Sequence, residues 1–316
     1  MREPLEIPGM SAAIGERDEI VWARGFGLAD RERSISAGPD SIYHLASVTK
    51  PYSAVVVLQL VDESKLDLNQ PVSDFGVNIG EGVRVWHLLS HTSTKPPGTV
   101  FRYDGVAFGH LTRIVEQAGG RPFTVELTDR IIRRLGLKHT APNPRRIDAA
   151  PPDDPGHRTF DLSRLDRSFM EARLVTGYGR SSLTGTLRPM PHLTYLFASA
   201  GLIASAPDVV RFSLGIDRGE LIKESTRTRA FSQVSDSVPY GLGWFVQTHR
   251  EMKVVWHFGQ TSESSSLVVK IPEKQLTFVV LANSNGLSRG RGLGDSADVQ
   301  RSPVAMLFLN WIANRR

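Results

Sequence analysis

The chain has 316 residues, of which 40% are hydrophobic and 22% are charged, and its formal net charge is +5. This length and composition indicate a globular protein that can bury a sizeable core. The absence of cysteine excludes disulfides, thiolate metal sites and a cysteine nucleophile. Because the positive charge is spread over scattered arginines and not gathered into a basic run, no nucleic-acid partner is predicted.

The sequence also bears on membranes and compartment. No apolar run approaches the roughly 20 residues that a membrane-spanning helix needs. The first twenty residues lack an apolar stretch followed by a small-residue cleavage site. We therefore expect no membrane span and a cytoplasmic protein, or a periplasmic or secreted one if a leader has been removed.

The N-terminal residues predict a β-hairpin. Residues 10–14 and 20–26 are rich in strand-forming side chains and flank a polar turn. Residues 25–27 (Gly-Phe-Gly) could be mistaken for part of a phosphate-binding loop, but no helix is predicted after them. We interpret them as a bend or bulge in a strand.

A short strand at residues 42–45 is followed by a predicted helix that begins at or near Ser47. Serine favours a helix start, and Pro51 is tolerated because it falls within the first turn. Residues 54–61 are apolar nearly all round, which is typical of a helix buried inside a large domain. Lys50 lies one helical turn after Ser47, so both side chains are expected on one face at the mouth of this helix.

Ser47 and Lys50 have two possible interpretations. A serine becomes a nucleophile when a neighbouring base removes its proton, and a buried lysine with a lowered pKa can be that base. The backbone N–H groups at a helix start also favour developing negative charge. However, a Ser-x-x-Lys spacing is expected about once by chance in such a chain. On this stretch alone, Ser47 as a helix cap and Ser47 as a nucleophile both remain open.

The middle of the chain predicts an inserted helical region. Residues 82–91, 104–118 and 124–135 are predicted helices, the second with a clear 3.6-residue period. His87 and His91 have a zinc-ligand spacing, but no glutamate follows His87 and no third ligand is in view, so a metal site is not predicted. Residues after these helices are rich in Pro, Arg, Ser and Gly, and we expect an irregular segment at 142–191 that borders a pocket.

The last third predicts mostly sheet. A helix is expected at residues 207–214 and another at residues 303–313. Between them lie four β-rich segments, at residues 240–248, 254–258, 265–271 and 276–283. Strands at both ends with helices between them predict a single α+β domain, with one antiparallel sheet built from both termini. In this interpretation residues 1–70 and 198–316 form the α/β part, and 71–197 form the insertion.

Several short motifs follow one another in a distinctive order. They are SIYHLASVTK, VWHLLSHTS, PGTVFRY, ASAGLIAS, YGLGWFV and VVWHFGQTS. In this order the sequence resembles the penicillin-recognising serine hydrolases, and in particular the branch that holds class C β-lactamases, family VIII carboxylesterases and D-amino-acid-specific peptidases. The resemblance covers about residues 7–286 and implies a β-lactamase/transpeptidase-like fold.

The resemblance implies roles for residues of the first two catalytic motifs. Ser47 would be the nucleophile and Lys50 its base. Tyr103 would relay protons to the leaving group, since a phenol beside a cationic lysine can have a lowered pKa. Gly105 stands where an asparagine is usual in the second motif, which puts some substrate contacts in doubt.

The third motif is implied at residues 257–259. His257, Phe258 and Gly259 would lie beside the substrate on the edge of the sheet, with Gly259 leaving room for the substrate to approach. The backbone N–H groups of Ser47 and Gln260 would form the oxyanion hole. Phe258 replaces a hydroxyl residue that helps bind the carboxylate of a penicillin. Together with the missing asparagine, this argues against an efficient β-lactamase.

A second serine signature competes with Ser47. Residues 286–290 (Gly-Leu-Ser-Arg-Gly) match the nucleophile elbow of α/β-hydrolases, which would make Ser288 the nucleophile. That elbow needs a strand that ends directly before the serine and a helix that begins directly after it. Neither is predicted here, so we expect Ser288 to be a loop serine.

These observations predict a metal-free and cofactor-free serine hydrolase that works through an acyl-enzyme, with small acyl esters as the preferred substrates. A D-amino-acid-specific peptidase, a weak β-lactamase and an acyltransferase remain as alternatives. A non-catalytic homologue that binds a ligand or acts as a sensor is the alternative from another class. The partner expected is a small-molecule ester or amide, and the oligomeric state is open.

Overall fold

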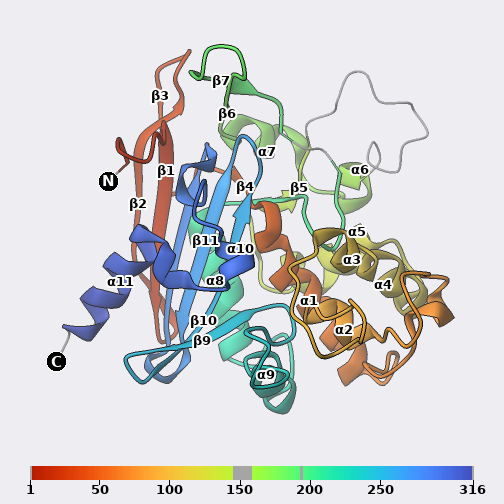
Figure 1. The fold of residues 1–316 in the computed structure, drawn as a ribbon. Coiled ribbons are helices and arrows are strands. Elements are labelled where there is room, and N and C mark those ends of the chain that lie inside the picture. The colour runs from red at the N-terminus through yellow and green to blue at the C-terminus, as the bar shows by residue number, and fades with distance from the viewer. Residues whose placement is uncertain (1, 145–158, 193–194, 315–316) are drawn as a thin grey trace.

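In the computed structural model, residues 2–144, 159–192 and 195–314 are described. The centre of the fold is a seven-stranded antiparallel sheet with the order β3-β2-β1-β12-β11-β10-β9 (Figure 1). Its strands are β1 (Gly9–Glu16), β2 (Glu19–Asp30), β3 (Ile35–Ser36), β9 (Phe245–His249), β10 (Met252–Gln260), β11 (Ser265–Ile271) and β12 (Leu276–Ala282). The first strand pairs with the last, so both ends of the chain meet in one sheet. The predicted α+β fold of the β-lactamase/transpeptidase type is confirmed.

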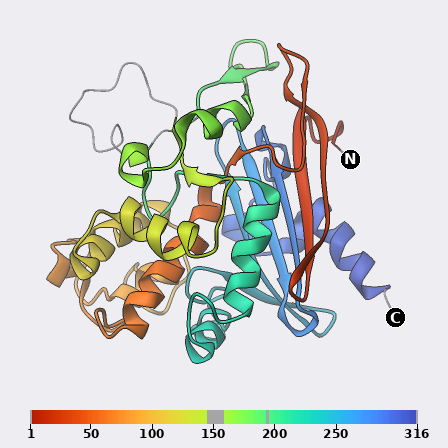
Figure 2. The same cartoon turned by 180° about the vertical axis from the view of Figure 1, so that it is seen from behind.

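Helices cover both faces of this sheet. On one face α8 (Ala206–Asp217) packs against β1, β2 and β12, as Figure 2 shows from behind. On the other face α11 (Pro303–Ala313) packs its apolar side into a second buried cluster. Both helices begin with a serine that caps the first turn and a proline inside it, which is why their starts could be predicted.

The strand predicted at residues 240–248 is shorter than expected, since β9 begins only at Phe245. Gly243 has a φ of +87°, and a side chain there would come within 2.3 Å of the Ala54 Cβ. The chain therefore turns closely over the central helix before it can extend into a strand.

The central helix α1 (Thr49–Asp62) is buried on all sides from Thr49 to Leu60, as its composition predicted. It begins two residues later than predicted, because a 3-10 turn at Ala46–Val48 precedes it. Ser47 lies inside that turn, and Val48, the residue at the N-cap position of α1, makes no capping hydrogen bond through its side chain. The interpretation of Ser47 as a simple helix cap is therefore wrong.

The helices of the middle region are shorter than the predicted ranges. They are α2 (Val85–Leu89), α3 (Gly105–Gly109), α4 (Leu111–Gly119) and α5 (Phe123–Leu127), the last continued by a π-helical turn at Thr128–Arg133. One predicted helix is divided at His110, where α3 ends and α4 begins. None of the helices in the described part of the chain combines the length and apolar composition needed to cross a membrane.

The segment predicted as irregular, residues 142–191, holds regular structure in its described part. It contains α6 (Thr159–Ser163), α7 (Arg167–Arg173) and the hairpin of β6 (Gly177–Arg180) with β7 (Leu187–Met190). These elements are too short to give a periodic pattern, which is why the prediction missed them. Residues 145–158 lie outside the described residues.

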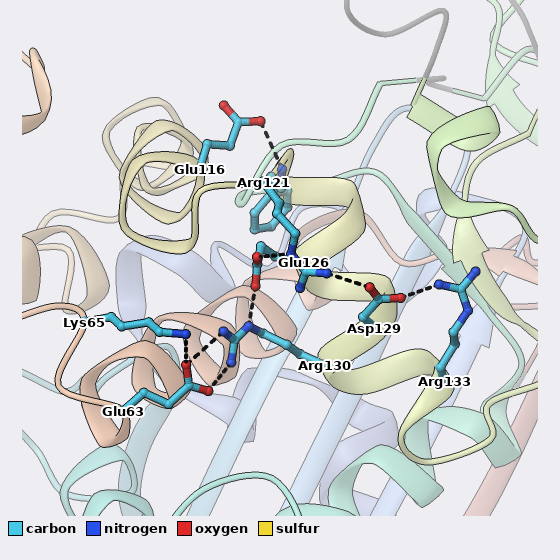
Figure 3. A network of polar contacts seen from close by, with 9 residues as sticks. Glu63, Lys65, Glu116, Arg121, Glu126, Asp129, Arg130 and Arg133 are labelled. Atoms are coloured by element: carbon cyan, nitrogen blue, oxygen red, sulfur yellow. Dashed lines mark hydrogen bonds and ion pairs between the residues drawn. The ribbon is translucent and has the colours of Figure 1, made fainter.

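An ion-pair network ties the end of α1 to α5 and the π-helical turn (Figure 3). Its members are Glu63, Lys65, Arg121, Glu126, Asp129, Arg130 and Arg133. Glu126 is its centre, with a side chain that is only 1% exposed and contacts both Arg121 and Arg130. Because Arg130 also binds Glu63, the network holds the helical region against the end of α1.

Candidate active site

Ser47 is held at the mouth of α1 by a constrained turn. The turn follows β4 (Tyr43–His44), which pairs with β8 (Leu202–Ala204) in a small sheet with β5 (Thr140–Pro142). Ala46, directly before Ser47, has a φ of +48°, a left-handed conformation that is costly for a residue with a side chain. The Ala46 N–H donates to His44 Nδ1 over 3.1 Å, which helps to hold this conformation.

Two neighbouring strands fix the same turn from outside. The Leu45 N–H donates to the Leu202 carbonyl of β8 over 2.9 Å. The Leu45 carbonyl in turn accepts a hydrogen bond of 2.6 Å from Ser266 Oγ of β11. The large sheet and the small sheet therefore both position the residue before Ala46 and Ser47.

Gly259 of β10 lies directly against this turn. A Cβ at Gly259 would stand 2.2 Å from the Leu45 carbonyl oxygen and 2.9 Å from the Ser47 nitrogen. A side chain at position 259 is thus excluded by the backbone of the protein itself, and the room that Gly259 would leave for substrate stays a prediction. Gln260 follows as the last residue of β10 and is exposed, so the strand ends beside the Ser47 amide. An oxyanion hole made by Ser47 and Gln260 stays a prediction that this placement supports.

Lys50 is the polar partner of Ser47. Its Nζ lies 2.8 Å from Ser47 Oγ and 3.2 Å from the Ser199 carbonyl oxygen. The lysine is 1% exposed. Burial lowers the Lys50 pKa to about 7, although the nearby Asp104 carboxylate acts in the opposite direction. A substantial fraction of Lys50 is therefore uncharged at neutral pH and can accept a proton.

Tyr103 stands beside Lys50 with its ring facing the amine. Lys50 Nζ lies 5.0 Å from the centre of the Tyr103 ring and 5.5 Å from that of Phe108. Within the described part of the chain, the buried Tyr103 hydroxyl has no hydrogen-bond partner of normal geometry. Burial raises the pKa of Tyr103 above its usual range, and the Ser47 side chain opposes this rise only in part. The lowered tyrosine pKa that we expected is wrong, because the effect of burial is larger than that of the Ser47 hydrogen bond.

The residues after Tyr103 are fixed by two contacts that the sequence did not reveal. Asp104 Oδ1 accepts the N–H groups of Val106 and Ala107, each over 2.9 Å, and caps α3. The Asp104 N–H donates to Nδ1 of the buried His91 over 3.0 Å. An aspartate before a helix start is a recognisable capping signal, but nothing in the sequence linked His91 to this loop.

Gly105 is the first residue of α3 and faces Lys50. A Cβ at this position would lie 3.8 Å from Lys50 Nζ, which is an ordinary contact distance. The place of the usual asparagine is therefore directly over the amine. A longer side chain at position 105 would contact Lys50.

His257 is placed near the site but is fully buried. Its Nδ1 lies 2.7 Å from the Phe258 carbonyl oxygen and its Nε2 lies 2.8 Å from the Tyr240 hydroxyl. Both ring nitrogens are thus occupied by protein groups. A direct contact of His257 with substrate stays a prediction that this geometry does not support.

Phe258 forms part of the wall next to Tyr103. The two ring centres lie 5.6 Å apart. A Cβ at Gly294, in α10 (Leu293–Ser296), would stand 3.3 Å from Phe258 Cζ and 3.2 Å from Tyr103 Cδ1. The segment after β12 therefore packs over both rings, which the sequence did not predict.

The other candidate residues lie in different environments. His87 Nδ1 accepts the Arg84 N–H at the start of α2 over 2.9 Å, and His91 is bonded to Asp104. The described ranges hold no group of three or more His, Asp or Glu side chains arranged to bind a metal ion. Ser288 is buried in a loop, with its Oγ 3.5 Å from the Gly259 carbonyl oxygen. Strand β12 ends at Ala282, well before Ser288, so the expectation of a loop serine is confirmed.

Comparisons with known proteins identify the family and the fold. The Beta-lactamase family model matches residues 1–300. Protein flp from Staphylococcus aureus (strain MW2) is 23% identical over 323 residues, a match that covers 88% of this chain and 60% of that protein. This chain thus spans about 60% of the length of that curated relative.

Two solved structures share the fold. The octameric penicillin-binding protein homologue from Pyrococcus abyssi is matched with a TM-score of 0.78 and 21% identity, over 97% of this chain and 75% of that one. The D-amino acid amidase from Ochrobactrum anthropi SV3 is matched with a TM-score of 0.73 and 18% identity, over 98% of this chain and 96% of that one. The family match over nearly the whole chain and the shared fold agree with the resemblance seen in the sequence. The chain therefore belongs to the Beta-lactamase family.

Proposed function

We propose that this protein hydrolyses small acyl esters through a covalent acyl-enzyme on Ser47. The Ser47 oxygen attacks the ester carbonyl carbon while Lys50 Nζ takes the hydroxyl proton. The N–H groups of Ser47 and Gln260 stabilise the negative charge on the carbonyl oxygen. The proton passes to the leaving alcohol as the ester C–O bond breaks, and Tyr103 assists as a proton donor. A water molecule then releases the acid and restores Ser47.

The contact between Ser47 and Lys50 supports this proposal most strongly. The two side chains are 2.8 Å apart, and burial lowers the Lys50 pKa to about 7. A general base works best when its pKa lies near the working pH, because it is then often uncharged and still basic enough. Burying a lysine lowers the stability of the fold, and a serine with only a structural role would not need a buried lysine beside it.

Two residues favour a neutral ester over a β-lactam. Phe258 packs against Tyr103 and supplies no hydroxyl for a substrate carboxylate. Gly105 supplies no amide group over Lys50. An alcohol is a better leaving group than an amine. Ester cleavage therefore needs less assistance from a site that lacks the hydroxyl at position 258 and the amide at position 105. Amides of D-amino acids, the class named for the Ochrobactrum enzyme, are the second substrate class to test.

The direct test is turnover of p-nitrophenyl acetate and p-nitrophenyl butyrate by the wild type and by Ser47→Ala. Ser288→Ala is the matched control, because it removes the hydroxyl of the competing serine motif. We expect steady turnover that is lost in Ser47→Ala and retained in Ser288→Ala. A single stoichiometric burst would instead indicate a protein that is acylated once, as in a sensor. Nitrocefin and a D-amino acid amide in the same assay rank the other substrate classes.

A further inference from the structure

Behind Lys50 and Tyr103 lies a buried pair of polar side chains that the proposed reaction does not use. Tyr240 and His257 are both 0% exposed, and the tyrosine hydroxyl lies 2.8 Å from His257 Nε2. His257 belongs to β10, whereas Tyr240 precedes β9, so the contact joins two segments 17 positions apart. The other nitrogen of His257, Nδ1, lies 2.7 Å from the Phe258 carbonyl oxygen.

These contacts assign the protons of the pair. A carbonyl oxygen can only accept a hydrogen bond, so the Nδ1 of His257 carries hydrogen. Burial and the neighbouring Lys50 lower the pKa of His257 well below its usual range, which leaves the ring neutral with one N–H. Nε2 is then the acceptor, and the Tyr240 hydroxyl donates to it. Burial raises the pKa of Tyr240 well above its usual range, so the tyrosine keeps the proton that it donates.

Titratable groups approach this imidazole from several parts of the fold. They are Lys50 of α1, His91 after α2, Tyr103 before α3 and Tyr240 before β9. Burial lowers the pKa of His91 well below its usual range, and both tyrosine pKa values are raised. Asp104 acts on Lys50, whose own pKa lies at about 7. Because His257 is neutral, it adds no second positive charge beside Lys50 in this buried space when Lys50 carries its proton.

We propose that Tyr240 is a positioning residue for the Ser47–Lys50 site, which fixes His257 as a neutral imidazole with its hydrogen on Nδ1. The inference rests on the proposed function of Ser47 and Lys50. Tyr240 is fully buried and acts through His257, not on the substrate. The Nδ1–H of His257 donates to the Phe258 carbonyl and so holds the backbone that leads to Gly259, against which the Ser47 turn is packed.

Replacing Tyr240 with phenylalanine removes one oxygen atom from the pair. His257 Nε2 then loses its donor in a buried place, which destabilises the neutral ring, and we expect the ring to take up a proton at higher pH than before. We expect kcat for an ester to fall roughly tenfold with little change in KM. We also expect the decline of kcat/KM at acid pH to become steeper, because a second group must lose its proton. Unchanged kcat and an unchanged slope would overturn the proposal.

Tyr52→Phe is the matched control. Tyr52 is also fully buried, and its hydroxyl has no hydrogen-bond partner among the described residues. Tyr52→Phe also removes one phenolic oxygen, but it breaks no hydrogen bond to His257. We expect kcat and the pH profile of Tyr52→Phe to match the wild type. An equal loss in both variants would show that any buried tyrosine oxygen matters, and would contradict a specific role for Tyr240.

Nitrogen NMR of the histidine rings tests the pair without any turnover. The signals of His257 are identified by their loss in His257→Gln. In the wild type we expect the neutral Nδ1–H form from about pH 8 to about pH 5, and in Tyr240→Phe we expect protonation to begin within this range. A wild-type His257 that is charged, or that carries its hydrogen on Nε2, would overturn the proposal even if Tyr240→Phe failed to fold. If Ser47→Ala kept full activity, the proposed function would fail while the NMR result for the pair still stood.

A double variant shows whether Tyr240 acts through His257. Glutamine at position 257 cannot become a cation, so Tyr240→Phe should change kcat little further in a His257→Gln background. Two effects that simply add would contradict the proposed coupling, because residues acting through one contact are not additive.

Discussion

Gly259 and Ser47 approach each other so closely that a single methyl group between them has no room. A Cβ on Gly259 would lie 2.9 Å from the Ser47 nitrogen and 2.2 Å from the Leu45 carbonyl oxygen. Backbone atoms on both sides cannot yield as a flexible side chain can. The position of the nucleophile therefore depends on a glycine in a strand more than 200 residues further along the chain.

The first prediction follows from this contact. We expect Gly259→Ala to push the Ser47 turn away from β10, to abolish ester turnover and to lower the free energy of unfolding by about 1–3 kcal/mol. Gly38→Ala is the control, since a Cβ at Gly38 meets nothing within 4 Å. Urea unfolding and steady-state kinetics measure both effects. An active Gly259→Ala enzyme would contradict the placement of Ser47 against this strand.

The second prediction concerns the pH dependence of the reaction. Because burial lowers the Lys50 pKa to about 7 and the base must be uncharged, kcat/KM should rise with pH through about pH 7. Lys50→Arg, which keeps its charge at every accessible pH, should be inactive throughout. A profile of kcat/KM that stays flat from about pH 5.5 to about pH 8.5 would contradict Lys50 as the base.

The same buried lysine predicts a gain in stability when it is removed. A lysine with a lowered folded-state pKa binds fewer protons than in the unfolded chain, so its presence costs stability at neutral pH, and this cost declines as pH rises from about 7 toward the ordinary lysine value of 10.5. We expect Lys50→Met to be inactive but more stable by roughly 1–2 kcal/mol at pH 7. Thermal unfolding at two pH values checks the sign, because the gain should be smaller at the higher pH. A destabilised Lys50→Met would contradict it.

Gly105 offers a test of substrate preference. A side chain there would lie directly over Lys50 Nζ at an ordinary contact distance. We expect Gly105→Asn to raise the ratio of nitrocefin to ester kcat/KM, because the amide restores a substrate contact that the wild type lacks. Gly105→Ala, which adds only a methyl group, should leave this ratio unchanged. Equal ratios in all three proteins would show that position 105 does not set the preference.

The ion-pair network of Figure 3 predicts a purely structural effect. Glu126→Gln leaves Arg121 and Arg130 facing a neutral group at a buried position, while each keeps a second carboxylate, and should lower the free energy of unfolding by about 1–3 kcal/mol. Glu224→Gln is the control, since Glu224 is 86% exposed and lies 3.8 Å from Arg227. Its effect should stay below about 0.5 kcal/mol. Similar losses in both variants would contradict a special role for Glu126.

Regular elements with a local signal could be predicted from the sequence. Strand β11 and helix α11 were predicted with the bounds that the structure shows. In α11, Ser302 caps the helix and Pro303 begins it, and both act within a few residues of the chain. The buried nature of α1 was equally clear, because its residues are apolar on every side.

Contacts between distant segments could not be predicted in this way. A short strand was predicted at residues 42–45, and β4 lies within it, but its pairing with β8 beside the Ser47 turn could not be predicted. The hydrogen bonds of His91 to Asp104 and of His257 to Tyr240 depend on how four separate segments pack together. For the same reason the sequence could name Gly259 as part of a motif but could not show that the Ser47 backbone fills the space beside it.

The identity of the nucleophile is the central claim, and labelling with a fluorophosphonate tests it most directly. Such a probe forms a covalent adduct with an activated serine, and peptide mass spectrometry then locates the adduct without knowledge of the substrate. We predict a single adduct on Ser47, with a labelling rate that rises through about pH 7 as Lys50 loses its proton. Lys50→Arg should label slowly at every pH. An adduct on Ser288, or none on Ser47 in the folded protein, would contradict this account.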